Sequence, residues 1–166
     1  MAKPFAKPIR ESPESDPQQY LLYRMENEAI GARQYLSLTR NELTRYLNGL
    51  VKTYRTPPVK IVFEDLGDWA AEWRDPNIIV FGTKRSSRDI LTAAHEFSHH
   101  LHGHLAEDFV HENHGREFMA CYMSVLDVSR MIPVVGMRAI CKSYGIKFAD
   151  PGTEPDVEKL AKIVRR

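Results

Sequence analysis

Hydrophobic residues recur at helical spacing in two segments near the start of the chain. In residues 18–30 they fall on one face, and Gly31 is expected to end that helix. A second helix is predicted after Thr39, because Thr39 and Glu42 form a capping-box pattern. The proline pair at 57–58 stops it. The apolar stripe predicted for this helix consists of Leu43, Tyr46, Leu47, Leu50 and Val51.

The pattern changes after the prolines, where short β-branched and aromatic runs predict strands. Residues 60–65 (KIVFED) and 77–82 (NIIVFG) are the two clear runs. The stretch between them, WAAEWRD at 69–75, is a candidate third strand, although its period does not distinguish a strand from a helix. We expect these runs to form a small antiparallel sheet.

Helical spacing returns in the second half of the chain. Ser86 and Asp89 repeat the capping-box pattern ahead of a helix that Gly103 is expected to close. After a loop at 104–112, Asn113 is the predicted N-cap of the next helix. The apolar stripe predicted for that helix consists of Phe118, Cys121, Tyr122, Val125 and Leu126.

The remaining pattern defines the limits of the folded domain. Pro133 suits the first turn of another helix, which is expected to end near Gly145. Residues 1–17 contain four prolines and scattered charges, which predicts a disordered tail. Residues 150–166 are expected to form a linker and a short charged helix, so the domain covers 18–149. Helices, a small sheet and then helices predict an α+β fold.

Composition narrows the class of protein. A chain of 166 residues with 43% hydrophobic residues is expected to form one domain with a real core. The net charge of +1 argues against non-specific electrostatic binding of nucleic acid by the whole protein. No run approaches the roughly 20 apolar residues of a membrane span, and no signal-peptide core is present, so we expect a cytoplasmic protein. Cys121 and Cys141 are expected to be buried free thiols.

The candidate chemistry lies in the histidines, because all seven fall between His95 and His114. His95, Glu96 and His99 match the pattern HExxH. On a helix, positions i and i+4 leave the same face one turn apart, so both imidazoles can reach one Zn²⁺. Glu96 is then placed to accept a proton from a metal-bound water. An accidental HExxH is expected in about 1% of chains of this length.

A catalytic zinc needs a third protein ligand, and two residues of the next helix are the strongest candidates. His114 lies four residues before Phe118 and shares its core-facing stripe. Glu117 lies near the same face, and a glutamate on a following helix is the gluzincin arrangement. The metzincin pattern fails, because it would need glycine at position 102 and histidine at position 105.

The other four histidines are weaker candidates. His100 points about 100° away from His99, and His102 lies about 10.5 Å along the helix axis from His95. His104 follows Gly103 and stays open as a ligand. We expect His111 to be a solvent-exposed loop residue.

The segments HEFSH and HGREF, with a fifteen-residue step from His99 to His114, resemble the SprT-like zinc metalloproteases. The strong match covers roughly residues 86–126. The resemblance implies a zincin-like fold in which His95, His99 and His114 are zinc ligands and Glu96 is the general base. It also implies that Phe118 packs under the third ligand. The expected substrate is a protein or peptide, which NIIVFG could bind by strand addition unless it is a plain core strand.

Members of this family cleave proteins crosslinked to DNA, so DNA is a further expected partner. The candidate DNA contacts are Lys52, Arg55, Lys60, Lys84, Arg85, Arg88, Arg138, Lys142 and residues 159–166, although a solvated charged surface is the favoured explanation for them. The chain has no cysteine pairs for a zinc ribbon. Arg116, His111 and Tyr122 are candidates for stabilising the oxyanion.

The alternative function is a non-catalytic zinc-binding protein of the same fold. A structural zinc site is closed by four protein ligands, and His104 or His111 would have to supply the fourth. Glu96 discriminates between the two functions, because a structural site has no use for a carboxylate beside its first ligand.

Overall fold

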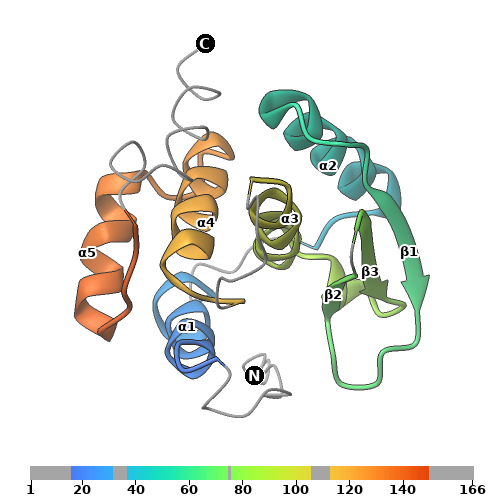
Figure 1. Ribbon diagram of the computed structural model, residues 1–166. Helices are drawn as coiled ribbons and strands as arrows, with labels where there is room; N and C mark the ends of the chain where they lie inside the picture. The colour runs from blue at the N-terminus through green and yellow to red at the C-terminus, as the bar shows by residue number, and fades with distance from the viewer. Residues whose placement is uncertain (1–15, 32–36, 75, 106–112, 150–166) are drawn as a thin grey trace.

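The computed structural model describes residues 16–31, 37–74, 76–105 and 113–149 (Figure 1). Within these ranges, five α-helices and three strands form a mixed α+β fold, as predicted. The helices are α1 (Gln19–Met25), α2 (Arg40–Tyr54), α3 (Ile90–Leu105), α4 (Arg116–Val128) and α5 (Val134–Tyr144), and the strands are β1 (Lys60–Glu64), β2 (Ala71–Arg74) and β3 (Ile78–Gly82). The π-helical turn η1 (Glu26–Ile30) continues α1, and the 3-10 turn η3 (Arg85–Arg88) precedes α3.

Helix α3 lies at the centre of the fold, between the sheet and α4 (Figure 1). It contacts β2 and α2 on one side and α4 on the other, while α5 packs against α4 and α1. Because both sides of α3 are covered, residues 91–98 are all buried. A helix that is apolar on most of its faces suits such a position.

The first two helices follow the predicted pattern closely. The capping box of α2 is confirmed: the Thr39 N–H donates to Glu42 Oε2 at 2.8 Å, and the Glu42 N–H donates to Thr39 Oγ1 at 3.3 Å. In the predicted stripe of α2, Leu43, Leu47 and Leu50 are buried, whereas Tyr46 and Val51 are partly buried. Gly31 ends the first helix, but its last turn is π-helical.

The expectation of an antiparallel sheet is wrong, because the sheet is mixed. The strand order is β1-β3-β2, with β1 parallel and β2 antiparallel to β3. The chain passes from β1 to the far side of β3 before it returns, so it enters β3 in the direction of β1. The NIIVFG segment is therefore a core strand with both edges paired, and Ile79, Val80 and Phe81 are buried. The strand-addition role predicted for it is wrong.

Three predicted helix boundaries also need correction. Ser86 lies in η3, and Asp89 caps α3 instead, since the Thr92 N–H donates to Asp89 Oδ1 at 2.9 Å. Gly103 lies inside α3, because burial of Leu105 offsets the roughly 1 kcal/mol cost of a helical glycine.

The third correction concerns the start of α4. Its N-cap is Gly115 rather than Asn113. A helix starting at Asn113 would use the His114 carbonyl as an acceptor within the helix. That carbonyl instead accepts from Gln18 Nε2 at 2.8 Å. His114 therefore precedes the helix that it was expected to begin.

The core forms mainly around α4. The predicted stripe of this helix is buried throughout, at Phe118, Cys121, Tyr122, Val125 and Leu126. The two cysteines are buried free thiols, as predicted, and burial raises the pKa of Cys121 to about 12 and that of Cys141 to about 11. Both thiols thus stay protonated and inert at neutral pH.

The described residues include no helix that is long and apolar enough to span a membrane. Asp16, which the sequence pattern assigned to the tail, is buried within the fold. The predictions for residues 1–15 and 150–166 fall outside the described residues.

Candidate metal centre

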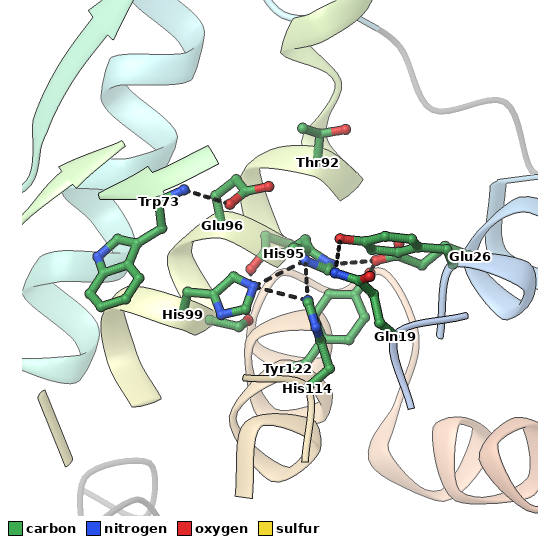
Figure 2. Close-up of polar contacts among 12 residues, drawn as sticks. Gln19, Glu26, Trp73, Thr92, His95, Glu96, His99, His114 and Tyr122 are labelled. Carbon is green, nitrogen blue, oxygen red and sulfur yellow. Dashed lines mark hydrogen bonds and ion pairs between the residues drawn. The ribbon is translucent and has the colours of Figure 1, made fainter. Parts of the chain in front are cut away.

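Three imidazoles converge at the point where α3 meets the start of α4 (Figure 2). The Nε2 atom of His99 lies 3.2 Å from that of His95 and 3.2 Å from that of His114, and the third side of the triangle measures 3.3 Å. Of the described residues, these three form the one group able to hold a metal ion. Glu117, the rival third ligand, is not part of it.

Helix periodicity positions the first two rings. His95 and His99 are one turn apart on α3, so both leave the face that meets α4. His114 enters from the turn before α4, where Gln18 holds its carbonyl.

The triangle fits a small tetrahedral cation. Nitrogen ligands about 2.0–2.1 Å from such an ion lie about 3.3–3.4 Å from one another. Two of the rings also present the right tautomer. Nδ1 of His95 lies 2.7 Å from Glu26 Oε1, and Nδ1 of His114 lies against Asp16 Oδ2. Carboxylates only accept, so each Nδ1 carries the hydrogen and each Nε2 keeps its lone pair for a metal.

The two carboxylates behind the rings are themselves buried. Asp16 is 3% and Glu26 is 7% exposed. Glu26 Oε1 also accepts from the Tyr122 hydroxyl at 2.8 Å. Burial and the neighbouring Glu26 charge raise the pKa of Tyr122, so its hydroxyl stays a donor. Tyr122 is thus committed to Glu26, which argues against its predicted role at an oxyanion.

Aromatic rings pack against the three histidines. The Phe118 ring centroid lies 4.4 Å from that of His99, 5.0 Å from that of His114 and 5.3 Å from that of His95. Trp73 stacks on His99 at 6.2 Å. Phe118 lies against His114, as the resemblance implied, and it packs against His95 and His99 as well.

Glu96 lies beside the triangle but outside it. The residue is 4% exposed, and its Oε2 accepts from the Trp73 backbone N–H at 2.8 Å (Figure 2). The carboxylate is therefore held between α3 and β2. The Tyr23 ring centroid lies 5.8 Å from that of His95 and 5.6 Å from that of His114, and burial followed by the negative charge of Glu96 raises the pKa of Tyr23.

The remaining histidines lie outside the triangle. His100 is buried, and its Nε2 lies 3.1 Å from the Pro57 carbonyl oxygen. Burial lowers the pKa of His100, so the ring stays neutral at pH 7. His102 packs edge-on against Phe118, and His104 is exposed. His111 lies outside the described residues.

The other residues considered for binding lie on the surface. Arg116, a predicted oxyanion donor, is exposed at the first position of α4. Exposed basic side chains among the predicted DNA contacts are Lys52, Arg55, Lys60, Lys84, Arg85 and Lys142, whereas Arg88 and Arg138 are partly buried. Basic side chains are exposed on a merely solvated surface and on a DNA-binding surface alike, so DNA binding stays a prediction.

Sequence reasoning missed four residues of the centre: Asp16, Tyr23, Glu26 and Trp73. Glu26 carried a readable signal, because it falls four residues after Leu22 on the apolar stripe of the first helix. A carboxylate on such a stripe needs a buried partner. Asp16 carried none, since it stands among prolines and charges in a segment with no period.

The chain matches no protein-family model, and searches of curated proteins and of solved structures give no match. The function is therefore inferred from the geometry of the centre.

Proposed function

We propose that this chain is a zinc-dependent metallopeptidase with a zincin-like, SprT-like domain. In this proposal His95, His99 and His114 bind Zn²⁺ and Glu96 is the general base. One observation carries the proposal. Three Nε2 atoms converge within 3.3 Å of one another, and the buried carboxylate of Glu96 lies beside them without belonging to the metal-binding group. A purely structural site would not need that carboxylate.

The donor set favours zinc among the common metals. Neutral imidazoles suit zinc, whereas calcium and magnesium prefer oxygen ligands. Three protein ligands leave the fourth tetrahedral position for water or substrate. Zinc bound there would lower the pKa of a coordinated water to about 7 and polarise a peptide carbonyl.

Glu96 is the residue placed to move the proton. Its position directly after His95 sets its carboxylate beside the triangle, and the Trp73 N–H orients it. In the proposed reaction the carboxylate takes a proton from the attacking water and later delivers it to the leaving amine. The surrounding burial keeps bulk water from competing for that proton.

The edge strand β2 supports a peptide as the substrate. The Gly82 N–H donates to the Ala70 carbonyl at 2.8 Å, so in this antiparallel ladder Ala71 and Trp73 direct their backbone groups away from β3. The Trp73 N–H meets Glu96 on that side. An extended peptide added along β2 would run past the proposed base. Strand addition, predicted for NIIVFG, is here assigned to β2.

The test compares zinc-loaded wild-type protein with Glu96→Gln on an unfolded protein substrate. We expect the variant to keep its zinc and to lose about 10²–10⁴-fold in hydrolysis rate. Zinc content is measured in the same samples. Equal rates in the two proteins would contradict the proposed mechanism. No hydrolysis by zinc-loaded wild type would favour the structural site instead.

A further inference from the structure

The segment of residues 16–31 supplies the two carboxylates that face the Nδ1 atoms of the metal centre and none of its three histidines. Asp16 faces Nδ1 of His114, and Glu26 faces Nδ1 of His95 at 2.7 Å. Carboxylates in this position hold the ring in place, fix its tautomer and raise the basicity of the ligand. The segment therefore acts on the metal site through the histidines rather than by ligation.

The same segment is docked on the rest of the fold by polar contacts close to the site. Gln18 Nε2 donates to the His114 carbonyl at 2.8 Å, and Gln18 Oε1 accepts from the Lys147 N–H at 2.5 Å. The Tyr122 hydroxyl donates to Glu26. These contacts join the segment to the third ligand, to α4 and to the chain after α5. Movement of the segment would thus disturb two of the three ligands.

A π-helical turn begins at Glu26, the residue that supports His95. The turn covers Glu26–Ile30, and the Gly31 N–H closes it on the Glu26 carbonyl. A Cβ atom at Gly31 would lie 2.7 Å from that oxygen, so glycine is needed for this closure. π-Helical turns are rare and recur at functional sites. Here the turn sets the backbone of a residue whose side chain reaches the metal centre.

We propose that residues 16–31 form a metal-coupled clasp, in which docking of the segment and metal binding stabilise each other. Asp16 and Glu26 are its positioning residues. The coupling is reciprocal by thermodynamic necessity: if docking tightens metal binding, metal binding tightens docking by the same factor. The clasp rests on the proposed metal centre but does not require peptidase activity.

The competing explanation is that apolar packing alone holds the segment. Leu22, Met25 and Ile30 are fully buried, and they would dock the segment whether or not a metal is bound. The two explanations differ in one measurable respect. Only the clasp makes zinc affinity depend on Asp16 and Glu26. Only the clasp also makes the amide hydrogen exchange of the segment depend on zinc.

The first measurement is zinc affinity by chelator competition, using the full chain. We expect Glu26→Gln and Asp16→Asn each to weaken zinc binding by about 10–100-fold. The matched control is Glu28→Gln, because Glu28 belongs to the same segment but pairs with Arg24 at the surface. The control should keep wild-type affinity. Wild-type affinity in both carboxylate variants would overturn the proposal.

The main result of the second measurement comes from wild type alone, so it does not depend on whether a variant folds. Amide hydrogen exchange of α1 and η1 is compared in metal-free and zinc-loaded wild type. We expect zinc to slow exchange in these elements, and Glu26→Gln to reduce that difference. Exchange that is the same with and without zinc would overturn the clasp. Neither measurement involves a substrate, so a failure of the proposed peptidase activity is recognised separately.

Discussion

The two sides of the metal centre differ in how the sequence encodes them. The histidine side, α3 and the start of α4, is encoded by local spacing, because His95 and His99 follow the period of one helix. On the carboxylate side, Asp16 and Glu26 meet their histidines across 98 and 69 positions of sequence. Two of the three candidate ligands, His95 and His99, are thus encoded by local spacing, whereas His114 and the groups that orient the rings depend on the tertiary fold.

The largest effect should follow from breaking the histidine side. His114→Ala removes one of the three proposed ligands, so we expect zinc affinity to fall well beyond the roughly 10–100-fold expected for a supporting carboxylate. His104→Ala is the control, because His104 is exposed. Zinc content after dialysis and chelator competition measure the difference. Full retention of zinc by His114→Ala would remove this residue from the ligand set.

The aromatic support of the histidine side can be broken without touching a ligand. Phe118→Ala leaves a cavity against all three imidazoles, and we expect it to lower the free energy of unfolding by about 3–5 kcal/mol. Chemical denaturation of the metal-free protein measures this loss. A loss below about 1 kcal/mol would mean that the surrounding side chains collapse into the space.

Gly31→Ala tests the carboxylate side through its π-helical turn. The added methyl would lie 2.7 Å from the Glu26 carbonyl oxygen, so we expect a loss of about 1–3 kcal/mol in the free energy of unfolding. Gly49→Ala is the matched control, because nothing lies within 4 Å of a Cβ at that exposed position in α2. The control should gain about 0.4–1 kcal/mol. If the two variants changed stability equally, the close approach at Gly31 would have no energetic consequence.

The smallest predicted effect concerns His100, a buried histidine outside the triangle. Burial lowers the pKa of His100, so below about pH 6.5 the unfolded chain takes up a proton that the folded chain resists. Stability is therefore lost as pH falls from that point toward the lowered pKa. His100→Gln removes this loss, so the advantage of wild type over the variant should shrink between pH 7 and pH 5. Denaturation curves of the two metal-free proteins give the comparison, and parallel pH profiles would contradict it.

Features that depend on residues close together in the sequence were predicted, whereas features that depend on distant residues were not. The capping box of α2 and the stripe of α4 were predicted, because each depends on residues three or four positions apart. The direction of β1 relative to β3 was not, because it depends on where β2 pairs. The start of α4 was missed for a similar reason: the His114 carbonyl accepts a hydrogen bond from Gln18, which is ninety-six positions away in the sequence.

The site divides in the same way. His95 and His99 share a helix face, so their approach follows from spacing alone. His114 and Glu117 could not be separated from sequence, since the choice depends on how the turn before α4 faces α3. The structure brings His114 to the other two and leaves Glu117 outside. Trp73 could not be predicted, because the backbone N–H that meets Glu96 and the ring that stacks on His99 both lie on a strand whose period was ambiguous.

The short length of β2 has a consequence for self-association. An open sheet edge can pair with the edge of another copy, and proteins avoid this with short strands and charged side chains. β2 has four residues and carries Arg74, which pairs with Glu72 at 2.5 Å and with Glu64 of β1 at 3.0 Å. One outward N–H of the strand is already taken by Glu96. The edge therefore offers only a short stretch of backbone, which suits a short extended peptide but disfavours the long edge-to-edge pairing of two copies.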